Sequence, residues 1–128
     1  MGALDQIIFD CERPSALARF WASVLDGYRV RAYDDAEIAR LAALGLTPET
    51  DPAVLVDGPG PSLCFQQLAQ PNAGRGRLHV DIAVPDRARE ITRLLALGAT
   101  VQREASGYTV MCDPEGNRFC VVLRRDSA

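Results

Sequence analysis

The sequence predicts an α+β fold in which a strand-helix-strand-strand-strand (βαβββ) module occurs twice, giving eight strands with the helices packed outside. A strand followed by an amphipathic helix occurs near residue 1 and again from residue 78. A turn of the pattern Asp-x-x-Gly-x-x-x-Cys enters the last strand of each copy, at residues 57–64 and 113–120. Helices that cover one face of a sheet leave the other face to line a pocket. We therefore expect one domain, residues 1–128, whose modules (1–73 and 74–128) form a curved eight-stranded sheet or open barrel around a pocket.

The composition excludes several classes of protein. A chain of 128 residues with 48% hydrophobic and 24% charged residues is typical of one globular domain. A net charge of -3 gives no basis for nucleic-acid binding, and no apolar run approaches the roughly 20 residues that cross a bilayer. The four cysteines form no Cys-x-x-Cys pair of the kind found in zinc or redox motifs, so we expect them to be reduced thiols. Together these features predict a cytoplasmic protein that binds neither nucleic acid nor membranes.

The first module begins with a strand within residues 1–11, and Pro14 then suits the first turn of a helix. Apolar residues recur at helical spacing until Gly27, and we assign Phe20 and Trp21 among them to the core. We expect the remaining strands of this module at residues 28–33, 53–56 and 63–68.

An insertion at residues 34–52 has no counterpart in the second module, and residues 36–44 within it read as a helix. Long insertions in compact domains are often lids or binding loops, so the segment could gate the pocket. The alternative is that Ile38, Leu41 and Leu44 dock the helix permanently on the barrel or on a second subunit.

The second module has a strand at residues 78–84, after which Pro85 and Asp86 favour the start of a helix. Ile91, Leu94 and Leu95 lie on one face of that helix, and Gly98 ends it. Strands at 100–103 and 108–112 form a hairpin around Ser106-Gly107, and the last strand spans 119–123.

Three segments, at residues 17–25, 78–84 and 113–120, resemble the vicinal oxygen chelate superfamily, in particular its glyoxalase-like branch. This superfamily includes glyoxalase I, fosfomycin and bleomycin resistance proteins, methylmalonyl-CoA epimerase and extradiol dioxygenases. The resemblance covers nearly the whole chain. It implies a small-molecule ligand bound by the sheet face that the helices leave open, and a homodimer.

Metal-dependent relatives bind one divalent ion with a residue from the first strand and a residue from the last strand of each module. The resemblance therefore implies four candidate ligands: Gln6, Cys64, His79 and Cys120. The last-strand positions are usually carboxylates in those enzymes. Because both are cysteine here, magnesium or manganese would be bound poorly, whereas zinc would accept the set. The alternative is a chain without a metal, in which Cys64 and Cys120 are small buried apolar residues.

His79 is the only histidine, and Asp81 shares its strand face because side chains alternate along a strand. A neutral imidazole beside a carboxylate can exchange protons near neutral pH, which is the chemistry of a catalytic acid and base. The alternative is that the pair only hydrogen-bonds within the pocket wall. Further residues expected to line the pocket are Gln6, Ile8, Asp10, Gln66, Tyr108 and Val110. For Tyr108 an exposed hairpin position is an equal alternative.

Three functions follow from this sequence. The first, favoured because the metal-binding carboxylates are missing, is small-molecule binding, as in a sequestering or self-resistance factor. The second is a lyase or isomerase that uses His79 and Asp81, with or without zinc. The third is a non-catalytic interaction module. Fold resemblance alone does not choose among them, because one fold hosts many functions.

Overall fold

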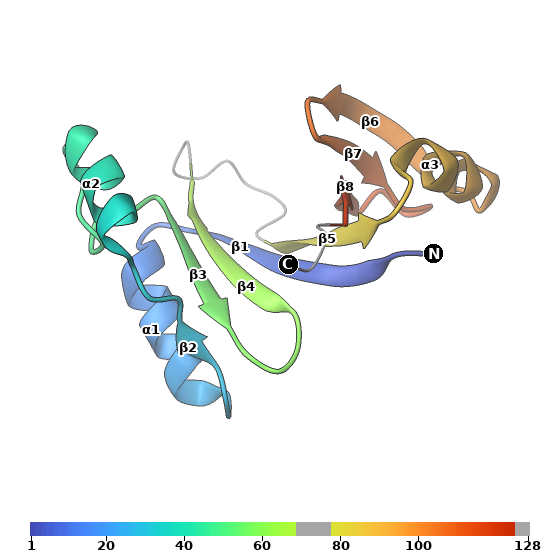
Figure 1. Ribbon diagram of the computed structural model, residues 1–128. Helices are drawn as coiled ribbons and strands as arrows, with labels where there is room; N and C mark the ends of the chain where they lie inside the picture. Colours follow the sequence, from blue (N-terminus) through green and yellow to red (C-terminus); the bar gives the residue numbers. More distant parts are fainter. Residues whose placement is uncertain (69–77, 125–128) are drawn as a thin grey trace. The chain divides into compact units, whose positions relative to one another are not determined.

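A computed structural model describes residues 1–68 and 78–124 (Figure 1). The elements follow in the order β1 (Ala3–Cys11), α1 (Pro14–Val24), β2 (Arg29–Val30), α2 (Asp35–Ala43), β3 (Ala53–Asp57), β4 (Ser62–Gln67), β5 (Leu78–Val84), α3 (Arg87–Ala96), β6 (Thr100–Ala105), β7 (Tyr108–Cys112) and β8 (Arg118–Leu123). The βαβββ order thus occurs twice, with α2 inserted in the first copy. The eight strands form one unclosed sheet of order β2-β3-β4-β1-β5-β8-β7-β6, which confirms the α+β prediction.

The chain divides into two compact units. Of the described residues, the α1 unit comprises 8–68, and the α3 unit comprises 1–7 together with 78–124. The strand β1 contributes its first half to the α3 unit and its second half to the α1 unit. The module boundary expected at residues 73 and 74 lies outside the described residues.

In the α3 unit, β5 pairs with β8 in parallel, and β7 pairs with both β8 and β6 in antiparallel fashion. The helix α3 packs on β8 and β6. Asp86 caps this helix by accepting a hydrogen bond from the Arg89 N–H at 3.1 Å. The core combines four buried residues, Val84, Ala99, Met111 and Val121, with the partly buried Ile82, Ile91, Leu94 and Phe119. Apolar residues from β5, β7, β8 and α3 therefore meet on one face of this sheet.

In the α1 unit, α1 packs on β2, β3 and β4. The Phe65 side chain is fully buried, and its ring stacks on Phe9 with the centroids 5.0 Å apart. Trp21 reaches the same aromatic group, 5.6 Å from Phe9. The expectation that Phe20 is a core residue is wrong, because its side chain is 57% exposed. The buried side of α1 follows Pro14 and Ala18, and a residue directly before Trp21 points about 100° away from it.

The strand expected at residues 28–33 is shorter in the structure, where β2 contains only Arg29 and Val30. The Arg31 N–H still donates to the Leu55 carbonyl at 2.8 Å, but the chain then leaves the sheet. It turns into α2, whose first turn is capped by the Asp34 carboxylate at 2.8 Å from the Glu37 N–H. A competing helix start three residues later therefore ends this strand.

The insertion is held against its own unit by several contacts. In α2 the Leu41 side chain is 1% exposed, whereas Ile38 and Leu44 are 42% and 65% exposed. The Arg19 guanidinium of α1 contacts the Glu49 carboxylate at 3.0 Å. These contacts favour a docked helix over a gate. None of the helices in residues 1–68 and 78–124 is long and apolar enough to span a membrane.

Candidate functional site

The two faces of the α3-unit sheet carry different chemistry. Ile82 and Val84 of β5, and Phe119 and Val121 of β8, belong to the core beneath α3. Side chains alternate along a strand, so the residues between them project from the opposite face. We call this opposite face, which carries His79, Asp81 and Cys120, the cluster face. Side chains were expected to alternate between the two faces along residues 78–84, and Ile82 and Val84 do lie together on the α3 side.

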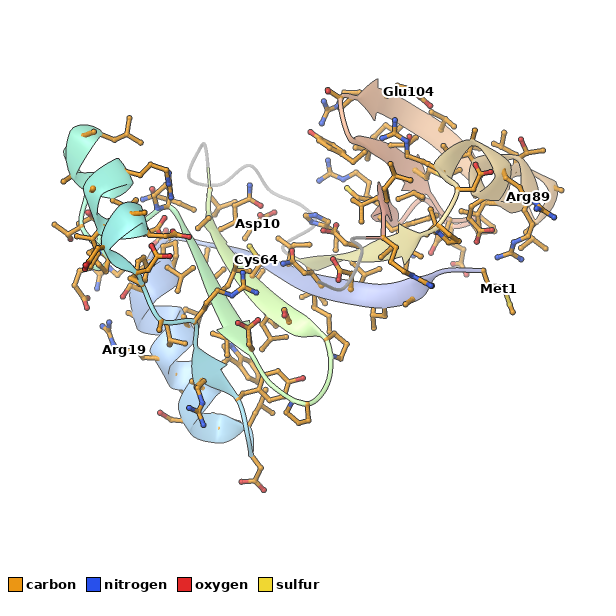
Figure 2. All side chains as sticks on the ribbon, viewed as in Figure 1. Met1, Asp10, Arg19, Cys64, Arg89 and Glu104 are labelled. Carbon is orange, nitrogen blue, oxygen red and sulfur yellow. The ribbon has the colours of Figure 1, made fainter. Side chains whose placement is uncertain are left out.

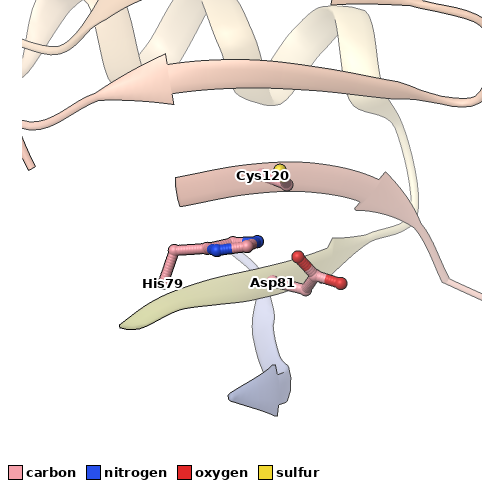
Figure 3. A group of neighbouring side chains, drawn as sticks. All are labelled: His79, Asp81 and Cys120. Carbon is pink, nitrogen blue, oxygen red and sulfur yellow. The ribbon is translucent and has the colours of Figure 1, made fainter. Parts of the chain in front are cut away.

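Three ionisable side chains meet on the cluster face (Figure 3). The ligand atoms of His79, Asp81 and Cys120 all lie within 4.8 Å of one another, and each residue is half-buried. Asp81 is paired directly with Cys120 in the parallel β5–β8 ladder. His79 lies two residues earlier on β5, on the same side. Partial burial strengthens the interactions of these groups with one another and with a ligand.

The surroundings change the protonation of two of these groups. Burial raises the pKa of the Asp81 carboxyl, His79 opposes this effect, and Asp5 adds to it. Burial also raises the pKa of the Cys120 thiol, as does the negative charge of Asp81, while Arg103 and Arg118 oppose the rise. Because only the thiolate is a strong nucleophile, a raised pKa argues against Cys120 as a nucleophile without a metal.

The donor set of this cluster fits zinc. A histidine nitrogen, a cysteine sulfur and a carboxylate oxygen are the ligand types that zinc accepts. Three protein ligands with one remaining position are typical of zinc sites that also bind water or a substrate. Of the four ligands expected from the sequence, His79 and Cys120 belong to this cluster, and Asp81 joins them although it was expected only as an acid or base.

The other expected residues are divided between the units. Val110 and Tyr108 lie on β7 of the α3 unit, where Val110 is paired with Cys120 and is 7% exposed. Tyr108 is half-buried, which is intermediate between the pocket position and the exposed hairpin position that were expected for it. Gln6 is also half-buried, on β1 in the same unit.

The remaining expected residues, Ile8, Asp10, Cys64 and Gln66, belong to the α1 unit. Ile8 is buried at 4% exposure, Asp10 and Cys64 are half-buried, and Gln66 is exposed. Cys64 lies between the buried Leu63 and Phe65, so it projects from the face of β4 opposite α1. Figure 2 labels Asp10 on β1 and Cys64 on β4.

The sequence reasoning missed Arg103. The predicted strand ended at this residue, but β6 continues to Ala105. The Arg103 guanidinium lies over the Tyr108 ring, 5.7 Å from its centroid, and donates to the Tyr108 hydroxyl at 3.4 Å. Its charge acts on Cys120. The available signal was the two-residue Ser106-Gly107 turn, which pairs Arg103 with Val110 across the hairpin.

A small open hollow lies in the α1 unit, with a volume of about 40 Å³. Its lining is formed by Arg31, Ala32, Tyr33, Glu37, Asp51, Ala53 and Leu55. The main polar groups of this lining already bind within the protein, because Arg31 pairs with Asp57 and the Tyr33 hydroxyl donates to Asp51. Organic ligands occupy cavities of roughly 300 Å³ or more. This hollow is therefore large enough for water and too small for an organic ligand.

Solved structures share the fold of this chain. A hypothetical protein from Bacillus halodurans is 14% identical, with a TM-score of 0.64 and coverage of 99% of this chain and 97% of that one. A glyoxalase/bleomycin resistance protein/dioxygenase superfamily member from Vibrio splendidus is 14% identical, with a TM-score of 0.57 and coverage of 97% and 100%. A single-residue variant of Streptomyces coelicolor methylmalonyl-CoA epimerase, solved with 2-nitronate-propionyl-CoA, is 13% identical, with a TM-score of 0.52 and coverage of 97% and 98%.

At these identities the similarity shows the fold and not the activity. A search of the curated proteins found no match. The model of the glyoxalase-like domain family matches residues 6–122, which include nearly all of both βαβββ copies and the residues of the cluster face. The chain therefore belongs to the glyoxalase-like domain family.

Proposed function

We propose that this protein binds a small organic molecule at the cluster face of the α3 unit, with His79, Asp81 and Cys120 as its polar contacts. The observation that supports this proposal is the convergence of three half-buried ionisable side chains within 4.8 Å. An imidazole, a carboxylate and a thiol on one sheet face can orient a ligand through hydrogen bonds. The epimerase of the same fold was solved with a coenzyme A ester, so this fold accommodates small-molecule ligands.

A lyase or isomerase activity is the second candidate, and the proximity of His79 to Asp81 favours it. The imidazole can accept a proton next to a carbonyl group and return it to a neighbouring atom. The raised pKa of Asp81 allows this carboxyl group to hold a proton at a higher pH than an exposed aspartate does. The same three residues would hold zinc, which when bound supplies a Lewis acid that polarises a carbonyl oxygen.

The binding proposal can be tested by nuclear magnetic resonance with a library of small organic fragments. Because His79 is the only histidine, its imidazole signals need no further assignment. We expect some fragments to shift these signals and to bind the His79→Ala variant about tenfold more weakly, the loss typical of one hydrogen bond to a charged or strongly polar group. The control is Arg89→Ala, on the exposed side of α3, which should leave the affinity unchanged.

Two results would contradict the binding proposal. The first is that every fragment that binds shifts only signals of the α1 unit. The second is that fragments bind His79→Ala and wild type equally well. The homodimer that the family resemblance implies stays a separate prediction, and sedimentation that finds only a 13.9 kDa species at high concentration would contradict it.

A further inference from the structure

One row of paired residues crosses the cluster face. Arg103 on β6 is paired with Val110 on β7, Val110 with Cys120 on β8, and Cys120 with Asp81 on β5. Residues that are directly paired in neighbouring strands project from the same face. At about 4.8 Å per strand, this row is roughly 14 Å long. It carries a guanidinium at one end and a carboxylate beside an imidazole at the other.

The β6–β7 hairpin places Arg103 in this row. Counted from the Ser106-Gly107 turn, the ladder is regular up to the pair Arg103–Val110. Gln102, the next residue, is an extra residue in β6, because Val101 is paired with Met111. Bulges of this kind are common at sheet edges and next to functional sites. The hairpin register therefore puts a positive charge on the cluster face, directly beside the bulge.

Arg103 has no acidic partner in the part of the chain that the structure describes. Arg19, Arg31 and Arg93 each contact a carboxylate at 3.0 Å or less. Arg103 forms no such pair in residues 1–68 and 78–124, and its side-chain contacts there are with Tyr108. The tyrosine ring holds the guanidinium by a cation–π contact and leaves most of its N–H donors available. An arginine held in this way is suited to bind an anion.

The charges on this face are arranged asymmetrically. Asp5 and Asp81 make the β5 end of the row acidic. Arg103 on β6 and Arg118 on β8 carry positive charge, and both act on the Cys120 thiol. Val110 separates Arg103 from Cys120 with an apolar side chain. An anionic ligand is therefore attracted to Arg103 and repelled from Asp81, which fixes its direction along the row.

We propose that Arg103 is the specificity-determining residue of the small-molecule site, and that its ligand is a small organic anion whose carboxylate or phosphate group binds this guanidinium. The inference rests on the proposed function, because it places the ligand on the same face. It goes further by naming the chemical class of the ligand and the residue that selects it. The uncharged part of the ligand extends along the row toward Cys120 and His79.

The experiment titrates isotope-labelled full-length protein with two matched pairs of probes, and follows the backbone signals of the row together with the His79 imidazole. Phenylacetate is compared with phenylacetamide, and phenyl phosphate with phenol, so that each pair differs mainly in charge. The proteins are wild type, Arg103→Gln, Arg103→Lys and the control Arg89→Gln on α3. Circular dichroism verifies that each variant is folded.

We expect at least one anion to bind wild type more tightly than its uncharged partner, and Arg103→Gln to bind that anion about tenfold more weakly. Arg103→Lys should retain part of the affinity, because it keeps the charge but loses the planar fork. Arg89→Gln should bind as wild type does. Tighter binding of phenylacetate would identify a carboxylate ligand, and tighter binding of phenyl phosphate would identify a phosphate ester.

The inference is overturned if Arg103→Gln binds the anions as tightly as wild type does, if the uncharged partners bind equally well, or if neither anion binds at millimolar concentration. The proposed function is judged separately. Probes that shift His79 equally in wild type and in Arg103→Gln, whether they are charged or not, would leave small-molecule binding in place while removing the role of Arg103. Fragments that avoid the cluster face altogether would remove both.

Discussion

Asp81 on β5 lies directly opposite Cys120 on β8, although 38 residues separate them in the chain. The parallel β5–β8 pairing joins the first and last strands of the second βαβββ module. It thereby places one residue from each strand, with His79 beside them, on the face away from α3. The polar cluster is thus a direct consequence of the connectivity of one module.

The first prediction concerns zinc. Zinc should raise the melting temperature of wild type, because binding to the folded state alone stabilises it by about 2.7 kcal/mol when the ion is present at about 100 times its Kd. His79→Ala and Cys120→Ser should lose most of this shift, since each removes one of three donors. A thermal scan with zinc and with a chelator, together with elemental analysis of untagged protein, measures the effect.

The control for this experiment is Cys112→Ser. Cys112 is also a half-buried cysteine, on β7, but it is paired with Arg118 and is absent from the group of three donors. Its variant should respond to zinc as wild type does. A zinc shift of equal size in Cys120→Ser, or no shift in wild type, would remove zinc from this face and leave a metal-free binding site as the account.

The second prediction concerns the α3-unit core. Met111 of β7 is fully buried in this core, together with Val84 and Val121. Met111→Ala should lower the free energy of unfolding by about 2–5 kcal/mol, through lost apolar burial and the remaining cavity. Leu123→Ala, at a position that is 53% exposed, should cost less than about 1 kcal/mol. Urea unfolding measures both, and equal losses would contradict the assigned core.

The elements of the fold that the sequence predicted are those whose start, end and buried face are set by neighbouring residues in the chain. The α3 helix and β5 were predicted well because Asp86 caps the helix and the alternation of Ile82 and Val84 is regular. The strand at residues 28–33 was predicted too long because the helix was expected to begin at residue 36, although Asp34 with Glu37 three residues later is a local signal for an earlier start. Phe20 fits a helical stripe by spacing, but the packing of α1 selects Ala18 and Trp21.

In the candidate site, too, the residues that were predicted are those with a local sequence signal. His79 and Asp81 share a strand, so alternation alone predicted their common face, and the internal repeat singled out Cys120. Arg103 lies on this face because the two-residue turn at Ser106-Gly107 pairs it with Val110. The turn is a local signal for that pairing, but the predicted strand ended at Arg103, and the residue was not considered for the site. The bulge at Gln102 has no such signal, because its position is set by pairing with the partner strand.

The third prediction concerns two glycines with positive φ. Gly98, after α3, has φ +107°, and a Cβ there would lie 3.3 Å from Pro114 Cγ. Gly107, in the β6–β7 hairpin, has φ +89° and no heavy atom within 4 Å of such a Cβ. In both alanine variants backbone strain should lower the free energy of unfolding by about 1–2 kcal/mol. The decrease should be larger for Gly98→Ala, because its Cβ also crowds Pro114. Equal decreases in urea unfolding would contradict this contact.

The fourth prediction concerns the hydrogen bond that anchors the insertion. The Tyr33 hydroxyl donates to Asp51 Oδ2 at 2.7 Å, and the other carboxylate oxygen of Asp51 accepts from the Ala53 N–H at 3.0 Å. Asp51 is only 6% exposed. Tyr33→Phe should therefore cost about 1–3 kcal/mol, since it leaves a buried charged acceptor without one of its donors. Tyr28→Phe is the control, because the Tyr28 hydroxyl donates to the neutral Pro61 carbonyl at 3.0 Å, and it should cost about 1 kcal/mol.

The same bond predicts how stability changes at alkaline pH. Burial raises the pKa of Tyr33, and the hydrogen bond to Asp51 raises it further. Because the pKa of the folded state lies above that of the unfolded state, the stabilisation is complete below the ordinary tyrosine pKa of about 10 and is lost as the pH rises above it. The difference in unfolding free energy between wild type and Tyr33→Phe should therefore shrink above that pH. A difference that stays constant from neutral to strongly alkaline pH would show that the Tyr33 hydroxyl does not bind the Asp51 carboxylate in solution.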